Sequence, residues 1–182
     1  MPFNFEGKRC LKKAEGGLRG LKNWADLTVL IPNQAIVEIF SKNITVREAF
    51  NKADQFLSFP VRAFSDILLK PSQSIAFEDI KQAFLPMGLS RVGFSTGREN
   101  GLLRAVEEAI HSPLLGGISL REAKGLISHI SIPGEVTIGE LREAVDSLLK
   151  EIGDCPDPIF NQVTLGNGIP AVTIIATGVE KI

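Results

Sequence analysis

Residues 45–70, TVREAFNKADQFLSFPVRAFSDILLK, divide the chain, because they predict one long helix between two different regions. Thr45 and Glu48 have the spacing of a capping box, in which hydroxyl and carboxylate each accept a hydrogen bond from a free backbone N–H. Apolar residues then recur at steps of three and four, which is typical of the helix side that faces a core. Pro60 is expected to kink this helix or to remove one of its hydrogen bonds. The apolar stripe consists of Val46, Phe50, Ala53, Leu57, Val61, Phe64 and Leu68.

The 44 residues before the long helix contain two predicted elements. A helix is predicted over 5–24, although Gly16 and Gly17 weaken it. The apolar, β-branched run at 27–33 predicts a short strand that Pro32 stops. One helix and one strand cannot form a sheet alone, so this region is expected to be the edge of something larger.

The region after the long helix predicts an α+β domain with about four strands, with helices on one side of the sheet. A second capping box at Thr137 and Glu140 opens a helix to about Ile152. Asn167-Gly168 is the strongest hairpin signal and predicts that the strands on either side of it pair antiparallel. The other elements expected are helices at 77–85 and 99–111 and strands at 90–95 and 125–131.

Composition excludes several classes of function. The length of 182 residues predicts one domain or two small ones, and a net charge of −1 gives no overall electrostatic reason to expect nucleic acid or an anionic membrane. The basic run KRCLKK at 8–13 is either a solvated helix face or a contact with an anion or partner. No apolar run approaches the length of a membrane span.

Cysteine and histidine are too scarce and too scattered for a disulfide framework or a metal site. Cys10 and Cys155 lie far apart in sequence and fit a reducing compartment. His111 and His129 share no ligand spacing with each other or with a cysteine, so we expect no metal. With no hydrophobic signal segment at the start, the cytoplasm is the expected compartment.

Five stretches occur in the order in which the FtsZ family has very similar ones, and together they span residues 2–179. They are PFNFEGKRCLKKAEGGLRGL, DLTVLIPNQAI, REAFNKADQFL, AIHSPLLGG and AVTIIATG. The chain therefore resembles FtsZ, the bacterial relative of tubulin that polymerises with GTP at the division site. The resemblance implies a remnant of the GTP-binding domain at 1–44, the central helix at 45–70 and the two-layer C-terminal domain at 71–182.

The same resemblance implies that the triphosphate site is absent. The family holds phosphate with a loop usually written GGGTGTG, which this sequence lacks. The glycine clusters at 16–17, 116–117 and 166–168 are not placed between a strand and a helix start, as phosphate binding requires. GTP or GDP binding, the property of the family, is thus expected to be weak or absent in this chain alone.

Three nucleotide-contacting positions match the family. Phe50 and Asp54 correspond to the pair set against guanine, and residues four apart share a helix face. The plainer alternative is that Phe50 is core and Asp54 is only solvated. Glu6 matches the acid that meets the ribose, whereas the following arginine of the family is replaced by Cys10.

The catalytic loop of the family, NxDxxD, is degenerate here. Its positions correspond to Ser74, Ala76 and Asp79, so one acid of two remains and the asparagine is gone. Asp79 is either a residual catalytic acid or, with Glu78, a first-turn carboxylate that favours the helix dipole. Whether the chain is an enzyme is left open.

Three functions compete. The first is an FtsZ-like division protein that contacts FtsZ, or a second copy of itself, through the loop face at 71–85. The second is half of a GTPase that another chain completes. The third is a stand-alone α+β module with an unrelated role, with a second pocket between the central helix and the sheet.

Overall fold

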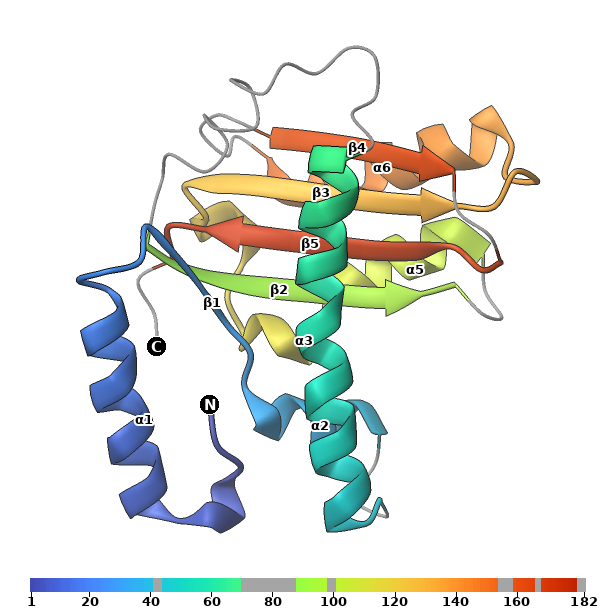
Figure 1. Cartoon of the computed structure of the whole chain (residues 1–182). Coiled ribbons are helices and arrows are strands. Elements are labelled where there is room, and N and C mark those ends of the chain that lie inside the picture. The colour runs from blue at the N-terminus through green and yellow to red at the C-terminus, as the bar shows by residue number, and fades with distance from the viewer. Residues whose placement is uncertain (41–43, 70–87, 98–100, 154–158, 166–167, 180–182) are drawn as a thin grey trace.

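The computed structural model (Figure 1) describes residues 1–40, 44–69, 88–97, 101–153, 159–165 and 168–179. The predicted helix at 77–85 lies outside these residues. The helices and strands in chain order are η1 (Asn4–Glu6), α1 (Lys8–Leu21), β1 (Leu27–Leu30), α2 (Asn33–Phe40), α3 (Val46–Leu69), β2 (Gly88–Thr96), α5 (Gly101–Ile110), η2 (Pro113–Leu115), η3 (Leu120–Glu122), β3 (Gly125–Ile132), α6 (Ile138–Ile152), β4 (Ile159–Leu165) and β5 (Ala171–Thr177).

The strands form one mixed five-stranded sheet in the order β1-β2-β5-β3-β4. β1 is parallel to β2 and β3 is parallel to β4, whereas β5 runs antiparallel to both of its neighbours, β2 and β3. The α+β class is confirmed. The predicted hairpin is wrong, because β3 lies between β4 and β5 and the chain crosses over it.

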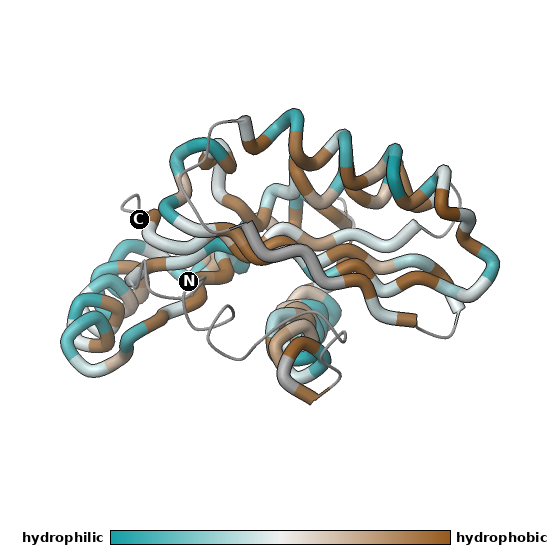
Figure 2. Tube along the Cα trace, turned by 90° about the horizontal axis from the view of Figure 1, so that it is seen from above, coloured by the Kyte–Doolittle hydropathy of each residue, from teal (hydrophilic) through white to brown (hydrophobic). Residues whose placement is uncertain are grey.

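Helices cover both faces of the sheet. α5 and α6 pack on one face and share a core with the sheet residues Leu126 and Ile174. α3 crosses the opposite face, where Ile67 packs against Ile127 and Ile175. Figure 2 shows the sheet edge-on, with α3 on one side and α6 on the other. Among the described helices, α5 and α6 lie on one side of the four C-terminal strands, as predicted.

The start of α3 is as predicted, but the side of α3 that faces the core is not. The Thr45 N–H donates to Glu48 Oε2 at 2.8 Å and the Glu48 N–H donates to Thr45 Oγ1 at 3.2 Å. The helix continues across Pro60 to Leu69. Of the predicted stripe, Val46, Phe50, Leu57 and Val61 are exposed, whereas Ala53 is buried and Phe64 packs partly buried against the core. The core side instead consists of Ala49, Ala53, Phe56, Pro60, Ala63 and Ile67.

The N-terminal region differs from its predicted form in two ways. Gly7, with φ of 85°, separates the turn η1 from α1, which therefore begins at Lys8. A second helix, α2, follows Pro32, and it buries Ala35 and Ile36. Proline is favoured at the first positions of a helix and also ends strands. The sequence prediction included only the end of the strand at Pro32.

The second capping box is confirmed and opens α6. The Thr137 N–H donates to Glu140 Oε2 at 2.8 Å, and the Glu140 N–H donates to Thr137 Oγ1 at 3.3 Å. Leu148 and Ile152 are fully buried, and Leu141 and Val145 pack against the same core. In the part of the chain that the structure describes, no helix is long and apolar enough to cross a membrane.

Candidate functional site

Three phenylalanines from two elements meet at the N-terminal end of α3. Phe3 is buried and stacks on Phe5, with ring centroids 4.9 Å apart and planes 12° from parallel. Phe50 meets Phe3 edge-on at 5.1 Å and Phe5 at 6.4 Å. Because Phe50 is still 41% exposed, one part of its ring is packed and the rest remains accessible. The geometry fits both the core interpretation and the base-stacking interpretation of this residue.

Glu6 lies beside this cluster and is engaged within its own turn. Its Oε1 atom accepts a hydrogen bond from the Phe3 N–H at 2.7 Å. Its Oε2 atom lies 3.6 Å from Cys10 Sγ, which donates to it. The cysteine that replaces the family arginine therefore contacts the carboxylate predicted to meet the ribose. These contacts fix the orientation of the carboxylate.

Asp54 follows Phe50 by one turn of α3 and is exposed. Residues four apart lie on the same helix face, so the carboxylate and the ring are neighbours on the outward side of α3. The structure thus brings Glu6 and Phe50 together through Phe3 and Phe5 and places Asp54 next along the helix. Ser74, Ala76, Glu78 and Asp79 lie outside the described residues, so the catalytic role of Asp79 stays a prediction.

Two glycine pairs of the sequence lie in the described part of the chain, and neither opens a helix. Gly16 and Gly17 lie inside α1, where their positions do not open a helix. Gly116 and Gly117 have φ of 68° and 75° and follow the short turn η2, away from the aromatic cluster. The nucleotide contacts expected at Glu6, Phe50 and Asp54, and the expected weakness of triphosphate binding, therefore stay predictions.

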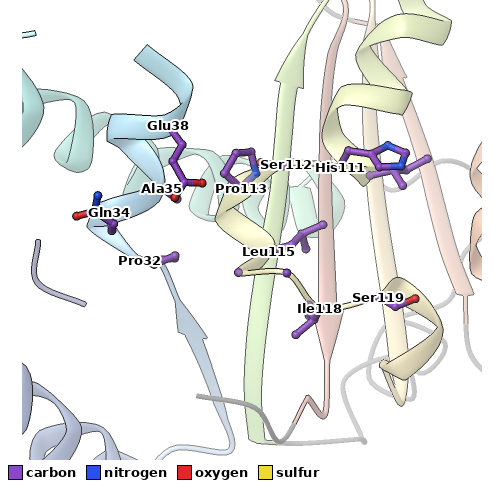
Figure 3. A pocket seen from close by; sticks show the side chains of 13 residues that line it. Pro32, Gln34, Ala35, Glu38, His111, Ser112, Pro113, Leu115, Ile118 and Ser119 are labelled. Atoms are coloured by element: carbon purple, nitrogen blue, oxygen red, sulfur yellow. The ribbon is translucent and has the colours of Figure 1, made fainter. Parts of the chain in front are cut away.

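A groove that the sequence did not predict lies between α2 and the segment after α5 (Figure 3). Its volume is about 690 Å³. Gln34 and Glu38 line it from α2, and His111 and Ser112 line it from the other wall. Ser112 is only 4% exposed, and its hydroxyl has no hydrogen-bond partner among the described residues. The groove was missed because α2 was missed.

A second cavity, of about 230 Å³, lies between α3 and the sheet. The hypothesis of a stand-alone module predicted a pocket at this place. His129 Nε2 lies 3.0 Å from Thr164 Oγ1 and 3.8 Å from Asp66 Oδ2, so the imidazole links strand β4 to helix α3. Phe59 and Phe94 form an aromatic wall, stacked with centroids 3.5 Å apart. The cavity combines this apolar wall with a few polar groups, as small-molecule sites do.

Acidic, histidine and cysteine side chains do not gather into a metal site. Within the residues that the structure describes, no three of them lie close enough together to hold an ion. Cys10 is a free thiol and Cys155 lies outside the described residues.

Comparison with known proteins gives a consistent result along the chain. Residues 87–180 match the profile of the FtsZ family, C-terminal domain. The cell division protein FtsZ of Wolbachia pipientis is 32% identical over 99% of this chain.

Solved structures agree with the sequence match. A tryptophan-to-tyrosine mutant of FtsZ from M. jannaschii superposes with a TM-score of 0.87 and 29% identity, covering 99% of this chain and 55% of its own. An empty FtsZ dimer from the same source gives 0.85 and 28%, covering 99% and 53%.

The relatives are longer than this chain. It spans 58% of the Wolbachia protein and between 31 and 58% of eight curated FtsZ relatives.

Proposed function

This chain belongs to the FtsZ family, within the tubulin superfamily, and from that premise we propose that it works in cell division through FtsZ-type contacts with other protein chains. One observation carries the proposal. Among the described residues, ten of the fourteen exposed large apolar side chains lie within residues 1–69. Contiguous exposed apolar surface marks interaction sites more often than scattered single residues do.

Helix α3 carries five of these ten side chains. Leu57 and Val61 are 55% and 63% exposed and lie one turn apart, and Val46 and Phe50 continue the line toward the start of the helix. On the inward side of the same helix, Ile67 packs on the sheet, and Ala49, Ala53 and Phe56 pack with Phe3 and helix α2. A polypeptide that carries the nucleotide-binding part of the family fold is the partner that this face suits, because the relatives contain sequence beyond the span of this chain.

A second contact is proposed at the segment 71–85, which lies outside the described residues. In the family resemblance this segment meets the nucleotide face of the next subunit. Docked there, the chain would cap a growing FtsZ filament or modulate its growth. Light scattering of polymerising FtsZ tests this, and we expect added chain to change the extent of assembly. Unchanged assembly at an equimolar ratio would rule the capping role out.

Self-association is the related possibility, because one of the structural relatives is a dimer. Sedimentation equilibrium over a range of concentrations tests it. A purely monomeric chain at all concentrations would leave contact with a longer FtsZ as the remaining form of the proposal.

A second candidate function is completion of a GTP-binding site by two chains. The accessible ring of Phe50, with Glu6 and Asp54 nearby, favours it. An aromatic ring can stack on a base, and a carboxylate can accept hydrogen bonds from the guanine N–H groups. Alone, the chain is expected to bind GTP or GDP weakly or not at all, since the sequence lacks the phosphate-binding loop of the family.

The experiment mixes this chain with the nucleotide-binding half of a relative and measures association first and GTP turnover second. Association with slow turnover is the expected result, given the degenerate positions Ser74 and Ala76. In the associated pair, Phe50→Ala and Asp54→Asn are each expected to weaken guanine-nucleotide binding. If the two halves do not associate, the two-chain site is abandoned.

A further inference from the structure

Helix α1 carries a concentration of positive charge that the net charge of the whole chain conceals. Between residues 8 and 22 there are six cations and a single acid, Glu15, whereas the full chain has a net charge of −1. All six cationic residues are exposed. They are Lys8, Arg9, Lys12, Lys13, Arg19 and Lys22.

The cations occupy one side of the helix. At about 100° per residue, the six side chains fall within an arc of roughly 180°, with Lys8, Lys12 and Arg19 close to its centre. Ala14 and Leu18 lie on the opposite side, and Leu18 is buried in the main core. The packed side fixes α1 to the body of the protein, and the cationic side faces solvent. α1 and α6 lie at opposite ends of the view in Figure 2.

Within the described part of the protein, no ion pair neutralises the positive charge on α1. In the described part of the chain, the arginines of α5 and α6 have acidic partners, such as Arg104 with Glu108 at 3.3 Å. No ion pair to any of the six cations of α1 occurs among those same residues. The positive electrostatic potential around these side chains therefore extends into solvent and attracts anions.

An exposed aromatic side chain lies at the end of the cationic helix. Trp24 is 91% exposed, and Leu21, just before it, is 53% exposed. An exposed indole is costly in water but stable at a membrane surface, where the ring meets the acyl boundary and its N–H meets polar headgroups. Basic residues with adjacent Trp and Leu are the composition of helices that lie on membranes.

We propose that α1 and Trp24 form a docking surface for a membrane rich in anionic lipid. Six cations, which form no ion pair among the described residues, supply the attraction to acidic headgroups, and Trp24 supplies a shallow apolar anchor. Duplex nucleic acid would satisfy the cations but offers no apolar layer to the exposed indole of Trp24. This surface is separate from the outward side of α3, so the inference does not depend on the proposed function.

Trp24 is the only tryptophan in the chain, so it reports on its own surroundings. The intact chain is mixed with vesicles of phosphatidylcholine alone or of phosphatidylcholine with phosphatidylglycerol, and tryptophan emission and co-sedimentation are measured. We expect co-sedimentation and a blue shift with the anionic vesicles only. Both effects should fall as salt is raised, because mobile ions screen exposed charges.

The decisive variant is Lys12→Glu/Lys13→Glu, which is expected to lower the vesicle-bound fraction by at least about tenfold. The matched control is Arg142→Glu/Lys150→Glu on α6, which changes the net charge equally at exposed positions and should bind as the unmodified chain does. Three results would overturn the proposal: no binding to anionic vesicles, equal loss in both variants, or binding to duplex DNA without binding to vesicles. The assay contains no FtsZ, so its failure is distinct from failure of the proposed contacts.

Discussion

At the scale of single residues, Gly93 shows how closely a helix approaches the sheet. A Cβ atom at this position on β2 would collide with the backbone carbonyl oxygen of Ala109 on α5. Neither backbone can move without disturbing the core between them. We therefore expect Gly93→Ala to lower the free energy of unfolding by about 1–3 kcal/mol, the usual cost of overpacking, as measured by urea denaturation.

Gly16→Ala is the control for this substitution. Gly16 is exposed inside α1, and an added Cβ meets nothing within 4 Å. Alanine is favoured over glycine in a helix by up to about 1 kcal/mol, so this variant should be at least as stable as the unmodified chain. Equal effects at the two positions would contradict the close approach of β2 and α5.

The carboxyl group of Glu140 is expected to make the stability of the protein depend on pH. The hydrogen bonds it accepts, first from the Thr137 N–H and then from the Thr137 hydroxyl, lower the pKa of its carboxyl below the ordinary value. A lowered folded-state pKa adds stability above the ordinary carboxyl pKa of about 4.3, and this stability is lost as the pH falls through the folded-state pKa.

The difference in urea midpoint between the unmodified chain and Glu140→Gln should therefore be greatest near neutral pH and shrink in acid. Glu48 has the same bonds to Thr45 and the same direction of pKa shift, so Glu48→Gln should behave alike. A difference that stays constant from neutral pH into acid would show that the charge on these carboxylates does not contribute.

At the scale of elements, the orientation of α3 places two adjacent residues, Phe56 and Leu57, in different environments. Phe56 is buried and meets Phe40, Phe59 and Phe94 edge-on, whereas Leu57 points outward and is exposed. Phe56→Ala should lower the free energy of unfolding by about 3–5 kcal/mol. Leu57→Ala should change it by no more than about 0.5 kcal/mol. Urea denaturation of the two variants measures the difference. A larger loss of stability in Leu57→Ala than in Phe56→Ala would support the apolar stripe that the sequence predicted to face the core.

The same helix shows what local sequence can and cannot predict. The capping boxes at Thr45 and Thr137 were predicted because a box is complete within four residues. The buried side of α3 was not, since its outward residues are as apolar as its inward ones and periodicity alone does not say which side meets the sheet. Half of the buried residues on the inward side are alanines, Ala49, Ala53 and Ala63, which allow close packing but contribute little to a hydrophobic pattern.

Strand pairing was predicted less well for a related reason. Asn167-Gly168 is a good turn sequence, but a turn does not decide which strands become neighbours. β3 lies between β4 and β5, and all three strands are apolar enough to occupy a central position. In the candidate site, Glu6, Phe50 and Asp54 came from the family resemblance. The contact of Phe3 and Phe5 with Phe50 joins residues more than forty positions apart and is visible only in the fold.

At the scale of the whole molecule, the exposed apolar side of α3 is the main argument for function. Leu57 and Val61 on the outward side of α3 are mostly exposed and contribute little to the stability of the described chain, so we infer that a partner covers them. Fully burying a leucine or valine contributes about 1.5–3 kcal/mol, and side chains that are already half-buried would gain roughly half of that from a partner.

The variant Leu57→Glu/Val61→Glu tests this argument. It removes the expected gain and places two carboxylates in the contact, where their burial without partners is costly. We expect binding to the nucleotide-binding half of a relative, measured by titration calorimetry, to weaken at least about a hundredfold, since each 1.4 kcal/mol is a factor of about ten.

Ile138→Glu is the control, because Ile138 is 87% exposed on α6, on the opposite face of the sheet. It adds a charge at an apolar exposed position and should leave binding unchanged. Both variants should unfold at nearly the same urea concentration as the unmodified chain, since all three positions are exposed. If Leu57→Glu/Val61→Glu binds as tightly as Ile138→Glu, the outward side of α3 is not the contact surface, and the apolar residues around it require another explanation.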